Sequence, residues 1–188
     1  ETRFSAARKL LSEFSMPNVT DRLVDLSVRP DPKTKVSLAL TIGHLALNPR
    51  SYSRWLSRDV SHLSIIFELN QALVSPLVIP GETSCLNCMQ EAKVDEEENW
   101  PVIATQLLGL PRVRDDAAAL LSACGLACRS ILRRLDEQAG FEYVRDDLHQ
   151  SLLGYRIDYA TGNIQRLRYE KHLLCSCREI SQNIEQSD

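Results

Sequence analysis

The sequence is short of several features that would assign it to a class at once. No run approaches the roughly 20 apolar residues that cross a bilayer, and no charged-then-apolar start resembles a signal peptide. Neither charge dominates, since 22 Lys and Arg stand against 25 Asp and Glu, for a formal charge of −3. We therefore expect no membrane and no nucleic acid among the partners of this protein.

Glycine is also scarce, and its placement matters for nucleotide binding. The seven glycines are scattered, so no two are close enough for G-x-G-x-x-G, and no P-loop is present. Nothing visible in this sequence would hold the phosphates of ATP.

What the sequence does contain is ordinary for a folded domain. It has 188 residues, of which 44% are hydrophobic and 25% charged, and this length suits one domain over residues 1–188. Six cysteines without a secretion signal indicate a reducing, cytoplasmic environment. There, thiols bind metals or undergo redox chemistry more often than they form disulfides.

Four stretches have helical character. Apolar periodicity predicts an amphipathic helix over residues 3–14, and an Ala- and Leu-rich stretch predicts a long helix over residues 113–138. Asn48 suits the N-cap of a helix over residues 50–59, with a proline in its first turn. Residues 94–110 begin with acids, which favours a helix N-terminus there.

Strand-like runs lie between these stretches. Pro76 falls inside one of them and predicts an edge position or a bulge. A Thr-Gly-Asn turn near the end predicts a hairpin. The runs cover residues 22–28, 35–42, 62–69 and 72–79, with the hairpin over 154–171. Together with the helices they predict a mixed α/β fold whose sheet is partly parallel.

Four cysteines form two close pairs far apart in the sequence. Cys85 and Cys88 make a C-x-x-C after a strand-like run, and Cys175 and Cys177 make a C-x-C after the predicted hairpin. Four sulfurs would fill a tetrahedral zinc shell and leave no position for water, as in structural sites. The 86 residues between the pairs exceed the usual zinc-ribbon spacing, so unrelated thiols are an alternative.

A second alternative is a thiol–disulfide oxidoreductase that uses Cys85 and Cys88, one of them exposed and of low pKa. Redox C-x-x-C pairs usually begin a helix, whereas the strand and the Pro-Gly bend before Cys85 favour a loop knuckle.

The remaining candidate residues have simpler explanations. Cys124 and Cys128 lie four apart among Ala and Leu, which favours buried small side chains. His172 precedes Cys175 by three residues and is a candidate to support the sulfur site or to pack near it. The other histidines have no clustered partners, and the acids from Asp95 to Glu98 point in different directions from a helix start, so no catalytic residue is assigned. These histidines are His44, His62 and His149.

Three motifs in a fixed order resemble one known family. "SPLVIPGETSCLNCMQ", "WPVIATQL" and "KHLLCSC", within residues 60–177, resemble the C-terminal half of the bacteriocin-biosynthesis cyclodehydratase-domain proteins. These are ThiF-like members of the ubiquitin-activating-enzyme superfamily. The resemblance implies a ThiF-like α/β fold, a mixed sheet with flanking helices. It also implies one structural Zn²⁺ on Cys85, Cys88, Cys175 and Cys177, in a zinc-binding part over about residues 60–188.

The resemblance carries expectations about function as well. It implies a role in making thiazole or oxazole rings in peptide-derived natural products, as a leader-peptide docking scaffold or as part of an ATP-dependent adenylating enzyme. The partners would be a precursor peptide or a cyclodehydratase, with a homodimer through residues 113–135 also possible.

Two departures from the family pattern qualify these expectations. Without a glycine-rich loop, the N-terminal nucleotide-binding half is apparently missing, and ATP is expected only if that half exists. Ser75 and Leu173 also replace a Gly and a Pro of the family pattern.

Overall fold

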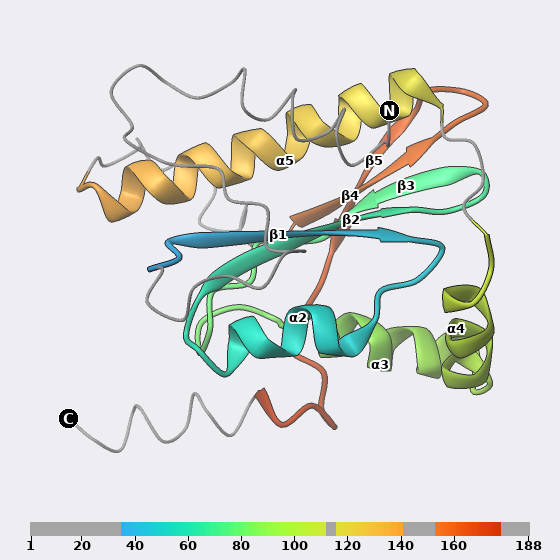
Figure 1. Ribbon diagram of the computed structural model, residues 1–188, viewed down its shortest axis with the longest axis horizontal. Helices are drawn as coiled ribbons and strands as arrows, with labels where there is room; N and C mark the ends of the chain where they lie inside the picture. The colour runs from blue at the N-terminus through green and yellow to red at the C-terminus, as the bar shows by residue number, and fades with distance from the viewer. Residues whose placement is uncertain (1–34, 112–115, 141–152, 178–188) are drawn as a thin grey trace.

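A five-stranded mixed sheet forms the centre of the computed structural model, which describes residues 35–111, 116–140 and 153–177. The strands lie side by side in chain order, and β1 and β2 are parallel while the later pairs are antiparallel (Figure 1). They are β1 (Leu38–His44), β2 (Ser61–Phe67), β3 (Gln71–Val74), β4 (Leu153–Asp158) and β5 (Ile164–Arg168). The predicted mixed α/β class is confirmed.

The crossover between the two parallel strands contains helix α2 (Pro49–Leu56), as its cap signals predict. The Asn48 side chain accepts a hydrogen bond from the Arg50 backbone N–H at 3.0 Å, and Pro49 occupies the first turn, where its missing N–H costs nothing. The buried side of α2 presents Tyr52 and Trp55.

Pro76 lies at a bulge, one of its two expected settings. Ile65 pairs with Val74, so a regular ladder would place His62 opposite residue 77, but His62 bridges Val78 instead. The β3 side therefore has one extra residue between these pairs. The Ser75 hydroxyl accepts the Ser64 backbone N–H at 2.8 Å, so the serine at this position satisfies a donor inside the sheet that glycine would leave unpaired.

Helices cover both faces of this sheet. On one face lies α5 (Ala117–Gln138), which begins where the Asp116 carboxylate accepts the Ala119 N–H at 2.8 Å. Its small side chains Ala119, Ala123 and Ala127 pack on Leu63, Ile65 and Val74 in one apolar cluster. On the other face α2 and α3 (Leu86–Glu96) cover a second cluster that contains Ile66 and Leu73 (Figure 1).

The acidic run occupies a different place from the one expected. A single helix over residues 94–110 is wrong, because α3 ends at Glu96 and α4 (Trp100–Leu108) begins after a turn. Asp95 and Glu96 therefore lie at a helix C-terminus, where the dipole does not favour them. No residue of α4 is buried, although the helix is largely apolar.

Some expectations fall outside the described residues. These are the helix over residues 3–14, the strand over residues 22–28, the start of the helix at residues 113–115, and His149. In the part of the chain that the structure describes, no helix has the length and apolar content to cross a bilayer.

Candidate metal centre

The two cysteine pairs meet on the α3 face of the sheet. Cys85 is the N-cap of α3 and Cys88 lies in its first turn, while Cys175 and Cys177 follow β5. Two contacts fix the segment after β5 against the loop before α3. Ser84 Oγ donates to the Tyr169 carbonyl at 3.1 Å, and Lys171 Nζ donates to the Gly81 carbonyl at 2.8 Å.

The sulfur positions suit a tetrahedral metal shell. Cys85 Sγ lies 3.8 Å from Cys88 Sγ and 3.5 Å from Cys175 Sγ, and Cys88 Sγ lies 3.4 Å from Cys177 Sγ. All four sulfurs are within 4.8 Å of one another. Zinc–sulfur bonds of about 2.3 Å place tetrahedral ligands about 3.8 Å apart, so the donor set fits Zn²⁺. The separations are too long for disulfides, and the cysteines are free.

The sulfur site is closed to solvent. The four cysteines are 2–6% exposed and share one apolar cluster with Leu47, Leu86 and Met89. Beside them the Tyr52 hydroxyl donates to Asn87 Oδ1 at 2.9 Å. Four thiolates around one ion would leave no place for water or substrate, which is the arrangement of structural rather than catalytic sites.

The thiols influence one another's ionisation. A hydrogen bond from Cys85 lowers the pKa of Cys88 to about 4, and the same contact raises the pKa of Cys85. Burial raises the pKa of Cys177 to about 12. One thiolate is therefore favoured, whereas further deprotonation in this buried site needs a bound cation to offset the negative charge.

The helical setting of Cys85 corrects one step of the sequence argument. The expectation of a loop knuckle away from a helix N-terminus is wrong, because the pair opens α3. This is the position that redox pairs use, and it favours a low thiol pKa. What separates this site from an exposed redox pair is burial: Cys88 is 2% exposed and also contacts Cys177.

The other candidates lie outside the sulfur cluster. His172 Nε2 lies 2.9 Å from Asp95 Oδ2, and the His172 carbonyl accepts the Cys175 N–H at 3.1 Å, so it packs beside the site. Cys124 and Cys128 are buried on α5, across the sheet, and burial raises the pKa of both thiols. His62 is buried within β2 and its Nδ1–H donates to the Val60 carbonyl at 2.8 Å.

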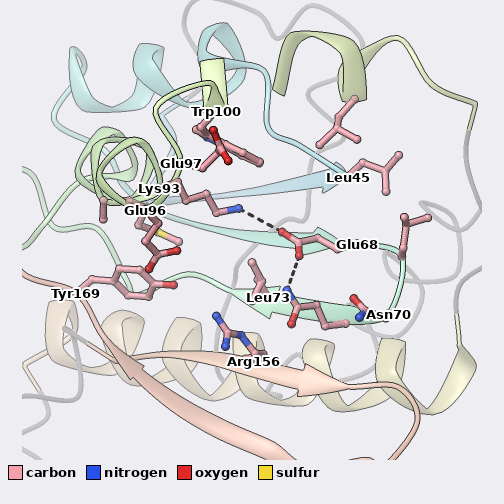
Figure 2. Close-up of a pocket in the computed structure, with 15 residues that line it drawn as sticks. Leu45, Glu68, Asn70, Leu73, Lys93, Glu96, Glu97, Trp100, Arg156 and Tyr169 are labelled. Atoms are coloured by element: carbon pink, nitrogen blue, oxygen red, sulfur yellow. Dashed lines mark hydrogen bonds and ion pairs between the residues drawn. The ribbon is translucent and has the colours of Figure 1, made fainter. Parts of the chain in front are cut away.

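A pocket that the sequence did not reveal lies beyond the carboxyl ends of β1 and β2. It has a volume of about 370 Å³ and is lined by Leu45 after β1, by Glu68 after β2, and by residues of α3, α4 and β4. Figure 2 shows Lys93, Glu68, Arg156 and Glu96 around its opening. The carboxyl ends of parallel strands are the usual ligand-binding edge of open α/β sheets.

Comparisons with known proteins bear on the fold. No family model matches the sequence, and no curated protein matches it. Solved structures do match, and they define the class as the α/β fold found in heterocyclases and microcin-synthesis proteins.

The individual matches are broad but distant. A heterocyclase solved with substrate and cofactor is 14% identical over 84% of this chain and 22% of its own, with a TM-score of 0.60. Escherichia coli MccB with succinimide is 15% identical over 78% of this chain and 40% of its own, with a TM-score of 0.53. The E. coli microcin synthetase McbBCD complex is 16% identical over 78% of this chain and 56% of the matched chain, with a TM-score of 0.52. The chain thus spans less than two thirds of each of these chains.

Proposed function

We propose that this chain is the zinc-stapled part of a ThiF-like protein that acts in the biosynthesis of thiazole- or oxazole-containing peptides. The observation that carries the proposal is the convergence of four buried thiols, from two pairs 89–90 residues apart in the chain, within a fold shared with heterocyclases. The ligands would be Cys85, Cys88, Cys175 and Cys177.

In this proposal the zinc is structural. It would join the start of α3 to the segment after β5, which otherwise meet through few hydrogen bonds. Structural zinc can supply on the order of 10 kcal/mol, which is comparable with the net stability of a whole domain. Neither pair alone could fix this geometry, because two ligands leave the ion half solvated.

The biosynthetic role follows the fold and the resemblance together. One matched heterocyclase was solved with its substrate, and the matched microcin synthetase is a complex of several proteins. By analogy, the partners of this chain would be a precursor peptide or a cyclodehydratase. We favour a docking scaffold for the precursor's leader, and a share in an ATP-dependent adenylating enzyme would additionally require a nucleotide-binding half.

Metal analysis tests the first part of this proposal. Purified protein should contain about one zinc per chain. Its four clustered cysteines should resist alkylation until a chelator is added, while Cys124 and Cys128, buried across the sheet, should stay protected even then. Protein without zinc whose cluster alkylates readily would contradict it.

A reconstituted reaction tests the biosynthetic part. A precursor peptide and a cyclodehydratase from the same organism would be combined with ATP, and mass spectrometry would count the loss of one water per ring formed. Ring formation should slow when this protein is left out and recover when it is added back. An equal rate of ring formation with and without this protein, together with no binding of the precursor by calorimetry, would contradict the proposed role.

A thiol–disulfide oxidoreductase is the second candidate, favoured by the lowered pKa of Cys88 at the start of α3. It predicts that a disulfide between Cys85 and Cys88 forms and breaks reversibly in glutathione buffers without loss of metal. Its weakness is access, since a 2% exposed sulfur offers little surface to a substrate disulfide.

A further inference from the structure

The pocket beyond β1 and β2 combines an apolar floor with a polar opening. Leu45, Leu73 and Met89 are 3–4% exposed and form its buried wall. The Trp100 indole N–H donates to Gln90 Oε1 at 2.8 Å, and Lys93 Nζ lies 4.2 Å from the centre of the same indole. These contacts hold the indole in place at the pocket edge, so the pocket has a rigid side.

Two hydrogen-bond donors at this opening have no hydrogen-bond partner among the residues that the structure describes. Arg156 lies opposite Leu73 in the sheet, and its guanidinium makes no hydrogen bond or ion pair with any residue that the structure describes. The Tyr169 hydroxyl nearby likewise makes no hydrogen bond within the described ranges. Figure 2 shows the two side chains pointing toward the same part of the opening.

The carboxylates around the pocket differ in the hydrogen bonds and ion pairs that they make. Glu68 is held by Lys93 at 3.2 Å and by Gln71, and Glu97 accepts from Asn99 at 3.1 Å. Glu96 makes no hydrogen bond or ion pair within the described part of the chain. Among the described charged residues that line the pocket, the side chains of Arg156 and Glu96 thus have no hydrogen-bond or ion-pair partner. Arg156 would attract an anion, and Glu96 would repel it.

We propose that this pocket binds an extended segment of the precursor peptide, placing an acidic side chain on Arg156 and Tyr169 and a neighbouring apolar side chain against Leu73 and Met89. A guanidinium fork and a hydroxyl match the geometry of a carboxylate. Leu69, which is 67% exposed, and Leu107 line the same pocket and extend its apolar surface. They favour a chain that continues past the acid over a free peptide C-terminus.

This inference rests on the proposed function only in taking a peptide as the ligand, and the test is independent of zinc. The probe is acetyl-Leu-Glu-Leu-amide, titrated into ¹⁵N-labelled full chain at constant zinc content. The reporter is the Trp100 indole N–H resonance, and the buried Trp55 on α2 is the internal reference. We expect the Trp100 signal to move saturably while the Trp55 signal stays in place.

Two variants should change the peptide affinity in opposite directions. Arg156→Gln should weaken binding by about two- to fivefold, as for an exposed charge-assisted contact. Glu96→Gln should tighten it by about twofold, because it removes the repelling charge. The matched control is Arg166→Gln on the neighbouring strand β5, an exposed arginine that does not line the pocket, and it should leave the affinity unchanged.

Four results would overturn the assignment. One is the absence of any saturable shift at Trp100, and another is equal binding of acetyl-Leu-Gln-Leu-amide. The third is weaker binding by the Glu96→Gln variant, which would show that the pocket prefers a cation. A free-carboxylate probe, acetyl-Leu-Leu, that binds better than the internal acid would also reject the extended segment. The chain could hold zinc and bind its precursor while Arg156→Gln leaves the precursor affinity unchanged. That result would support the proposed function and reject this pocket as the peptide-binding site.

Discussion

Removal of the proposed zinc should lower the free energy of unfolding of this fold by a measurable amount. Cys85 and Cys175, whose sulfurs lie 3.5 Å apart, are separated by 90 residues. Structural zinc can supply on the order of 10 kcal/mol, and we take roughly 4–5 kcal/mol, the entropy that a cross-link over a loop of this length offsets, as the least that chelation should remove. For a domain of this size that corresponds to a fall in Tm of about 10–20 °C. We expect a chelator to produce this loss in urea unfolding followed by Trp fluorescence.

The chain contains its own control for this experiment. Cys124 is 1% exposed and Cys88 is 2% exposed, but only Cys88 belongs to the sulfur cluster. A buried serine hydroxyl without a partner costs about 1–3 kcal/mol at either position. Cys88→Ser should lose the stability that the proposed zinc supplies in addition to this cost. Chelator should then lower its free energy of unfolding by less than about 1 kcal/mol, because the variant holds little metal.

Cys124→Ser should keep the full chelator response of the parent. If Cys88→Ser and Cys124→Ser lose equal stability, and both respond to chelator as the parent does, the sulfur cluster is not a metal clamp. A parent protein that melts at the same temperature with and without chelator would refute the reasoning just as directly.

Three further outcomes are expected. Because burial lowers the pKa of His62 below 6.5, the folded state resists a proton that the unfolded chain accepts. The free energy of unfolding should thus fall below pH 6.5 by at most about 1.4 kcal/mol per pH unit, and His62→Phe should flatten that slope in urea titrations. Gly154→Ala should destabilise by about 1–3 kcal/mol, since the added Cβ would lie 2.8 Å from the Val74 carbonyl oxygen, whereas equal melting of variant and parent would contradict this. Gly125→Ala, which meets nothing within 4 Å on α5, should instead raise stability by about 0.5–1 kcal/mol, and a lowered Tm would count against the helix as described.

The elements with strong local signals were predicted well from the sequence. The Asn48 cap, the Ala-rich α5 and the hairpin β4–β5 all lie where their patterns indicate. Helix α3 was missed for a physical reason. Its buried residues, Leu86, Cys88 and Met89, all lie in its first turn, so no apolar periodicity runs along the helix. Its N-cap is a cysteine, which gives none of the usual side-chain capping signals.

The candidate site divides along similar lines. Cysteine spacing and the family resemblance together named the four residues that converge, and the structure adds their distances and burial. The pocket left no such signature. Its walls come from Leu45, Glu68, Met89, Trp100 and Arg156, which belong to different elements and share no spacing. The long-range pairing of β3 with β4 and the packing of α3 and α4 bring them together, and no local pattern encodes these contacts.

The long separation of the two cysteine pairs has a consequence for how the protein is made. At a translation rate of about 5–20 residues per second, Cys85 leaves the ribosome roughly 5–20 s before Cys175, which lies 90 residues later. During that interval Cys85 and Cys88 have neither Cys175 and Cys177 nor the β4–β5 hairpin to cover them. Two cysteines that are only 2–3% exposed in the folded protein are therefore open to oxidants and competing metals while the chain is being made.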